Sequence, residues 1–273
     1  MNKLKTYGKE LVEEFQNDDV PVLASSQAYY YLLAIFPMLI LILSLLPYFS
    51  IDSDRVMSFI STNFPGDTAE IFRENIVSVV EEPSGGLLTF GILATIWSAS
   101  NGINAFIKAS NIAYNVEETR SFLKVRLISI ALTFGMIIAI IVAIMLPVFG
   151  DVIINFFQEL LRLPDSTVVV FQVLRWVISI TVMTLVLMGL YHIAPNKNIP
   201  FRSIIPGAIA TTLLWQLISL LFSFYISNFG NYSATYGSLG GIIILMLWFF
   251  LTGVILMIGA EINVITSKHK QSK

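Results

Sequence analysis

The residues of this sequence that could do chemistry are polar side chains that interrupt long apolar runs. Within a bilayer such a side chain is costly unless it finds a partner or water, so we interpret these positions as candidates for substrate binding. The candidate residues are Gln27, Tyr29, Tyr30, Trp97, Asn101, Asn104, Asn111, Arg120, Arg126, Gln216, Tyr236, Glu261 and Asn263.

Glu261 directly follows 58 residues without a formal charge and the small pair Gly259-Ala260. The end of the apolar run predicts that the helix ends at Glu261, where a carboxylate would face the negative end of the helix dipole. Two interpretations are open: the carboxylate marks the membrane boundary, or it is held inside the bundle against a cation. Small residues let a neighbouring helix approach closely, which favours the second. The cations at a similar predicted depth are Arg120, Lys124, Arg126 and Arg202.

The polar groups fall at similar predicted depths in four of the expected helices, and the basic segment 108–126 flanks them. This arrangement predicts a polar cavity that opens on the cytoplasmic side and is ringed by cations. Such a cavity suits the head group of an anionic lipid or a small anion. We therefore expect membrane lipids as partners and an anionic lipid or solute as substrate. We expect no nucleic acid as a partner, and the sequence allows both a monomer and a homo-oligomer.

Signatures of enzymes are nearly absent. The two histidines, His192 and His269, lie on different predicted elements, and we interpret His192 as a hydrogen-bonded structural residue. A nuclease needs clustered carboxylates for metal ions or a histidine pair for acid–base work, and the sequence places neither on the cytoplasmic face. We therefore expect no catalytic residue, no metal and no cofactor.

The composition defines the elements that must position these residues. Of the 273 residues, 56% are hydrophobic and 12% are charged, against about 25% charged in soluble domains. The uncharged runs are 21–51, 83–107, 127–150, 176–196 and 203–260. A span needs about 20 apolar residues, so the first four runs predict one helix each and the last predicts two. The fold class is therefore all-α, a polytopic integral membrane protein with six transmembrane helices.

The expected helices form a single membrane domain over residues 1–273, and three further segments accompany them. Residues 2–19 predict an amphipathic helix, either lying on the inner membrane surface or simply solvated. Residues 52–85 predict an amphipathic outer insert between the first two spans, and residues 229–241 a joint between the last two. The expected spans are 24–49, 87–107, 127–149, 176–194, 204–228 and 241–261.

Lysine and arginine counts predict the orientation of the spans. Twelve of the 16 basic residues fall in the N-terminal segment, segment 108–126, the link 197–202 and the C-terminal tail. The other four fall in the alternate connections. The positive-inside rule therefore predicts that both termini are cytoplasmic.

Three stretches carry a resemblance to a known family. The runs AYYYLLAIFP (28–37), WSASNGINAFIKASNIAYNVEETRSFLKVR (97–126) and YGSLGGIIILMLWFFLTGVILMIGAEIN (236–263) resemble the YihY/BrkB membrane family, once labelled ribonuclease BN. The positions that match its motifs are Ala28, Tyr29, Tyr30, Pro37, Trp97, Asn111, Tyr114, Arg120, Arg126, Tyr236, Gly237, Gly240, Trp248, Gly259, Glu261 and Asn263.

The resemblance implies six transmembrane helices in a bacterial cytoplasmic membrane, but it supplies no mechanism. The ribonuclease label finds no support in these residues. Some members of the family are linked to the handling of envelope lipids, which favours a lipid role. Three hypotheses follow: a transporter or flippase for a lipid or anionic solute, a non-transporting scaffold in envelope assembly that docks through residues 52–85, and an enzyme that acts on lipid at the membrane, which has the least support.

Overall fold

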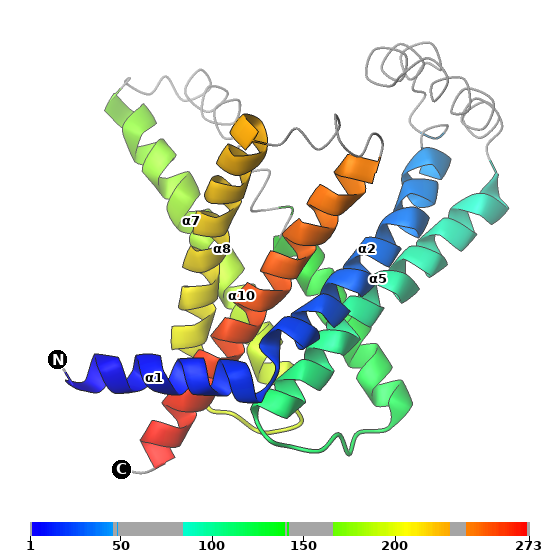
Figure 1. The fold of residues 1–273 in the computed structure, drawn as a ribbon. Helices are drawn as coiled ribbons and strands as arrows, with labels where there is room; N and C mark the ends of the chain where they lie inside the picture. Colours follow the sequence, from blue (N-terminus) through cyan, green and yellow to red (C-terminus); the bar gives the residue numbers. More distant parts are fainter. Residues whose placement is uncertain are drawn as a thin grey trace. The chain divides into compact units, whose positions relative to one another are not determined.

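The computed structural model describes residues 2–45, 48, 84–139, 141, 166–229 and 239–271. Seven helices account for nearly all of these residues (Figure 1). The predicted outer insert, apart from its last residues, and most of the 229–241 joint with Tyr236 lie outside the described residues. The helices are α1 (Asn2–Asn17), α2 (Val20–Leu45), α5 (Gly85–Ala113), Phe122–Ala139, α7 (Ser166–Ile193), α8 (Phe201–Phe229) and α10 (Leu239–Gln271).

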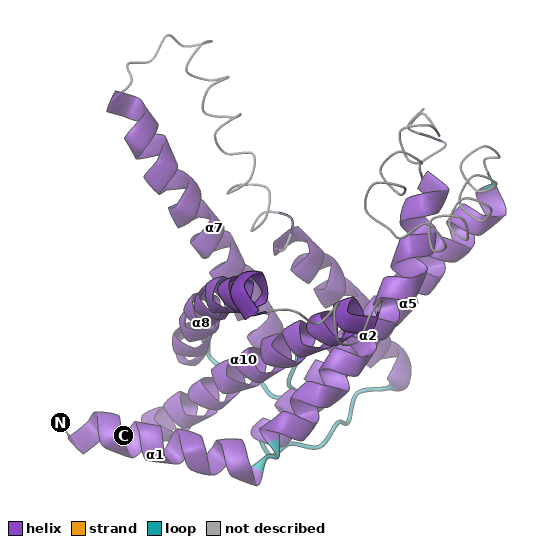
Figure 2. Cartoon of the chain, turned by 45° about the horizontal axis from the view of Figure 1, so that its top comes forward, coloured by secondary structure: helices purple, strands orange, loops and turns teal. Residues whose placement is uncertain are grey.

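Six of these helices are long and apolar enough to cross a membrane, which confirms the predicted number of spans. Within the described ranges the chain is helical, with short turns between some elements and no strand (Figure 2). Helices suit this setting because each satisfies its backbone hydrogen bonds internally. The chain divides into two compact units, Met1–Tyr29 with Gly102–Lys273 and, separately, Tyr30–Asn101. The single membrane domain stays a prediction.

The predicted end of the last helix at Glu261 is wrong. Helix α10 continues to Gln271, so Glu261 lies within the helix and not at its negative dipole end. The apolar run ends at Ala260 because charged residues begin there, but Lys268 and Lys270 sit near the C-terminus of the helix, where cations are favourable. The limit of an apolar run marks a change of surroundings, and it does not mark the end of a helix.

The extension of α10 explains what α1 does. Lys268 donates a hydrogen bond to Glu14 Oε1 at 2.6 Å, and His269 Nε2 lies 2.7 Å from Glu10 Oε2. The ring of His269 also stacks on Tyr7 at 4.5 Å between centroids. Helix α1 therefore packs on the last turns of α10 (Figure 1), so it is not simply a solvated helix.

Helices α7, α8 and α10 pack closely where small residues face one another. Gly207 of α8 lies against the backbone of Gly259 in α10, so closely that a Cβ on Gly207 would overlap the Gly259 carbonyl. The Tyr191 hydroxyl of α7 donates to the Leu256 carbonyl at 2.8 Å and accepts from Thr211 of α8 at 2.7 Å. One buried hydroxyl therefore joins three helices, and the close approach predicted from Gly259-Ala260 is confirmed.

The C-terminus of α5 is closed by a Schellman motif. Val116 N–H donates to the Asn111 carbonyl at 2.9 Å, Asn115 N–H donates to the Ile112 carbonyl at 2.8 Å, and Asn115 has φ of 51°. This left-handed conformation is tolerated by asparagine and glycine, and it costs other side chains about 1–2 kcal/mol. The motif turns the chain into the connection that carries Glu118 and Arg120.

We expect Asn115→Val to lower the free energy of unfolding by about 1–2 kcal/mol, because a β-branched side chain is strained at positive φ. Asn115→Gly is the control and should be within about 0.5 kcal/mol of wild type. Chemical unfolding of the detergent-purified proteins measures both. Equal midpoints for the two variants would show that the left-handed conformation is not maintained.

Candidate functional site

Glu261 is the most unusual polar residue of the described chain. Its side chain is 0% exposed, and neither carboxylate oxygen meets a hydrogen-bond donor among the described residues. Small residues let α10 pack closely in the turns that precede Glu261: Gly253 lies against Ala24 at the start of α2, and Gly259 lies against α7 and α8. An unpaired buried carboxylate costs several kcal/mol, so its presence needs an explanation.

Two further carboxylates accompany Glu261. Oxygen atoms of Glu14, Asp18 and Glu261 all lie within 4.8 Å of one another. Glu14 and Asp18 share one face because the final turn of α1 is helical, with Asp18 N–H donating to the Glu14 carbonyl at 3.0 Å. Both are half-buried, whereas Glu261 is fully buried. We call these three residues the carboxylate cluster.

The three carboxylates of the cluster repel one another when they are ionised, because all three then carry negative charge. Burial raises the pKa of Asp18, and the negative charge of Glu14 adds to this, while a hydrogen bond with Glu261 and the charge of Lys268 act in the opposite direction. Two ionised carboxylates have no donor between them, so that hydrogen bond requires one proton on the pair. Like charges at this separation disfavour ionisation of both groups together.

Tyr114 lies near the carboxylate cluster, one residue beyond α5. Its side chain is 6% exposed, and its hydroxyl has no hydrogen-bond partner among the described residues. Burial raises its pKa, and the negative charge of Glu261 raises it further. The Lys197 ammonium lies 5.8 Å from the centre of the ring, a cation–π contact. A further buried oxygen without a partner among the described residues therefore feels the charge of Glu261.

Asn263 and Lys270 complete the junction between α10 and α8. Pro206 has no N–H, so the carbonyl four residues earlier, Arg202 O, loses its helical donor. Lys270 Nζ donates to that carbonyl at 2.7 Å, and Gly207 N–H donates to Asn263 Oδ1 at 2.8 Å. The polar residues at this depth therefore compensate for the proline in the first turns of α8.

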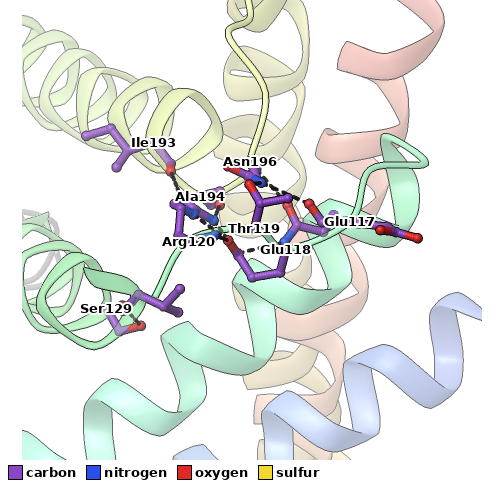
Figure 3. Close-up of polar contacts among 10 residues, drawn as sticks. Glu117, Glu118, Thr119, Arg120, Ser129, Ile193, Ala194 and Asn196 are labelled. Atoms are coloured by element: carbon purple, nitrogen blue, oxygen red, sulfur yellow. Dashed lines mark hydrogen bonds and ion pairs between the residues drawn. The ribbon is translucent and has the colours of Figure 1, made fainter. Parts of the chain in front are cut away.

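Arg120 joins the connection that follows α5 to the connection that follows α7, and we call this set of contacts the clamp (Figure 3). Its guanidinium pairs with Glu118 at 2.6 Å and donates to the carbonyls of Ile193 and Ala194 at the end of α7, at 3.1 and 2.8 Å. Asn111 donates to Glu118 at 2.9 Å and accepts from the Asn196 N–H at 2.7 Å. Arg120 therefore satisfies carbonyls that a helix end leaves without a partner.

The clamp predicts a pH dependence of stability. Hydrogen bonds from Arg120 lower the pKa of Glu118 from 4.5 to about 2, with a further hydrogen bond from Asn111 and against the effect of burial. A lowered pKa stabilises the folded state above pH 4.5, and this stabilisation is lost as the pH falls towards about 2. We expect the free energy of unfolding of wild type to be about 1 kcal/mol larger than that of Glu118→Gln at pH 6. The difference is small because solvent screens the partly exposed pair of Glu118 and Arg120.

Denaturant unfolding at pH 6 and pH 3 measures the difference between wild type and Glu118→Gln. The difference should shrink at pH 3. Glu13→Gln is the matched control, since Glu13 forms an exposed pair with Lys9 at 3.3 Å. A difference that stayed constant over this range would show that Glu118 is not held by Arg120.

The structure separates the predicted candidate residues into groups. Asn111 and Arg120 meet through Glu118, and Asn263 meets the start of α8. Gln27 and Arg126 are buried, Asn104 and Gln216 are half-buried, and Tyr29 is exposed. Tyr30, Trp97 and Asn101 belong to the other compact unit, and Tyr236 lies outside the described residues. The predicted polar cavity therefore stays a prediction.

Two expectations about Glu261 need correction. Its charged neighbours are Asp18, Glu14 and Lys268, and not the predicted cations. Arg120 is committed to Glu118 and to the end of α7 because the turn after α5 points it there. The expectation that no carboxylates cluster on this side was also wrong, because the fold brings α1 against α10. The signal that could have indicated this is the acidic pair at i, i+4 just before the first span.

His192 has the structural role that was predicted. Its Nδ1–H donates to the Ile199 carbonyl at 3.0 Å, and the ring stacks on Phe201 at 4.2 Å between centroids. His269 contacts Glu10 and Tyr7 on α1. The two histidines therefore stabilise separate junctions of the chain.

Six long apolar helices, with a buried carboxylate in the last of them, define a multi-pass α-helical membrane protein. Residues 11–273 match the family model described as "Virulence factor BrkB", so the chain belongs to the BrkB family. The family predicted from the three sequence motifs is thereby confirmed.

The chain is similar to several relatives over most of its length. It is 43% identical to the putative ribonuclease-like protein YfkH of Bacillus subtilis, and the match covers 96% of each chain. It is 27% identical to a UPF0761 membrane protein of Photobacterium profundum, over 96% of this chain and 81% of that one. No solved structure matches the chain.

Proposed function

We propose that this protein is a transporter or flippase that moves a lipid or an anionic solute across a bacterial cytoplasmic membrane, with both termini in the cytoplasm. The observation that supports this proposal is the Glu261 carboxylate, fully buried in a membrane-spanning helix without a donor among the described residues. Ionisable residues inside spans are expensive, and they characteristically serve ion or substrate pathways.

Two amide groups of the same compact unit share the lack of a partner that marks Glu261. The Gln27 amide oxygen and the Asn263 amide nitrogen are also buried without a hydrogen-bond partner in the described parts of the chain. Membrane proteins retain such groups where a substrate or water completes their hydrogen bonds. These groups would serve as the polar part of the pathway.

The preference for an anionic substrate rests on the exposed cations of the same compact unit. Lys124 and Lys197 are exposed and lie on or beside the two clamped connections, and Arg202 is exposed at the start of α8. Each lysine or arginine near an anionic membrane surface contributes about 1 kcal/mol of attraction. These cations would concentrate anionic head groups or solutes at this end of the bundle.

Reconstituted vesicles test the proposal. Leaflet exchange of labelled anionic phospholipids and efflux of small anions are followed in vesicles with wild-type protein, Glu261→Gln or no protein. We expect one of the two activities above the protein-free rate and at least a tenfold loss in Glu261→Gln. Folded wild-type protein that moves neither lipids nor anions under several ion gradients would reject transport and leave the scaffold as the better hypothesis.

We propose no ribonuclease activity for this chain, although a relative is named ribonuclease-like. The carboxylate cluster is the feature that a metal-dependent nuclease would use, but its central residue, Glu261, has no exposed surface for a phosphodiester. We expect purified protein with Mn²⁺ to cleave labelled RNA no faster than Glu261→Gln does. Cleavage that requires Glu261 would overturn this and make the protein an enzyme.

A further inference from the structure

We propose that Glu14, Asp18 and Glu261 form a binding site for one hard divalent cation, of the Mg²⁺, Ca²⁺ or Mn²⁺ type. This site goes beyond the proposed function, because it stands whether or not the protein transports. Carboxylate oxygens are the ligands that such cations prefer.

The spacing of the oxygens fits a single ion. Oxygen ligands of Ca²⁺ lie at about 2.3–2.6 Å, so two ligands of one ion are separated by no more than about 5 Å. The three carboxylate oxygens all lie within 4.8 Å of one another. An ion could therefore contact all three with only side-chain adjustments.

The unpaired oxygens point to a ligand rather than to a simple acidic surface. Both oxygens of Glu261 and one oxygen of Asp18 are buried without a donor among the described residues. One shared proton would satisfy a single contact between the two carboxyl groups and leave the second oxygen of Glu261 unpaired. A divalent cation can bind a carboxylate through both oxygens, so it satisfies more of them at once.

The local charge also favours a cation. The three carboxylates carry three negative charges when ionised, and Lys268, bonded to Glu14 at 2.6 Å, contributes one positive charge. Asp19, next to Asp18, adds a further negative charge, so the surroundings of the three carboxylates are negative overall.

The ligands come from two elements that meet only in the folded chain. Glu14 lies in the last turn of α1, Asp18 directly follows this helix, and Glu261 lies on α10, at the other end of the sequence. Glu14 and Asp18 are half-buried, so an ion could reach Glu261 from the side of α1. A bound ion would hold α1 on α10 and replace mutual repulsion by shared coordination.

Cation binding to the full-length protein tests this site. Protein purified in detergent is treated with a chelator and dialysed, and Mn²⁺ binding is followed by electron paramagnetic resonance and by titration calorimetry. Mg²⁺ and Ca²⁺ are then used as competitors. We expect one saturable Mn²⁺ site, a rise of the unfolding temperature on binding, and Kd values at least tenfold weaker in Glu261→Gln and in Asp18→Asn.

Two further variants make the test specific. Glu13→Gln lies one residue from Glu14 on another face of α1 and should bind Mn²⁺ like wild type. Lys268→Met removes the competing positive charge and should tighten Mn²⁺ binding severalfold, which provides a gain-of-binding readout if a carboxylate variant fails to fold.

Three results would overturn the cation site. The first is no Mn²⁺ binding by folded wild type, and the second is Mn²⁺ binding that is unchanged in both Glu261→Gln and Asp18→Asn. The third is an unfolding temperature that changes with pH and not with added Mn²⁺, which would show that Asp18 and Glu261 share a proton instead of an ion. Because binding is measured without vesicles, failure of the cation site and failure of transport are distinguishable.

Discussion

Gly259→Ala is expected to destabilise the protein by about 3 kcal/mol, a larger loss of stability than Asn115→Val or Glu118→Gln should cause. A Cβ on Gly259 would overlap the hydroxyl oxygens of Thr211 and Tyr191, which are themselves hydrogen-bonded between helices. Overpacking costs about 1–3 kcal/mol, and breaking a buried hydrogen bond adds a comparable amount. The unfolding temperature in detergent should fall by roughly 6–12 °C.

Gly241→Ala is the matched control, because Gly241 lies on the same helix and an added Cβ would have no atom of the described residues within 4 Å. Alanine is favoured over glycine in a helix by about 1 kcal/mol, so this variant should be neutral or slightly more stable. The contrast between the two glycines isolates the helix contact from helix propensity. Equal effects of the two substitutions would show that α8 and α10 do not cross at Gly259.

The sequence predicts the spans well because each depends on local composition. Five uncharged runs, the last of them long enough for two spans, predict six helices, and the structure describes six helices of suitable length. The ends are predicted less well, since α7 begins at Ser166 and α10 ends at Gln271. Polar residues can continue a helix outside the membrane, so hydropathy does not predict the residue at which the helix ends.

The sequence predicts Glu261 as a candidate residue, but it does not predict the residues that surround Glu261. Glu261 is conspicuous because a charge ends an apolar run, but its neighbours depend on how distant helices pack. The i, i+4 spacing of Glu14 and Asp18 predicts a shared face, and it cannot predict that this face meets α10. Proximity in predicted depth favoured Arg120 as a partner, and local turn geometry assigns Arg120 to the end of α7 instead.

Glu261→Gln is expected to separate stability from function. In the presence of a chelator, we expect the free energy of unfolding to rise by about 1 kcal/mol, because glutamine removes the carboxyl group that must share a proton with Asp18 and supplies N–H donors to the Asp18 carboxylate. Thermal unfolding in detergent measures this. Under transport conditions the same variant should lose at least tenfold in exchange rate, since a glutamine cannot bind a cation or proton as a carboxylate does.

Glu118→Gln is the control for this prediction, because its expected change in the free energy of unfolding has the opposite sign. Glu118 is paired with Arg120 and Asn111, so its neutralisation should lower stability, whereas Glu261 has no donor among the described residues and its neutralisation should raise it. A fall in stability for Glu261→Gln as large as that for Glu118→Gln, measured in chelator, would show that Glu261 is a paired structural carboxylate. A rise in stability together with lost exchange would instead indicate a residue whose charge is retained for function at the expense of the fold.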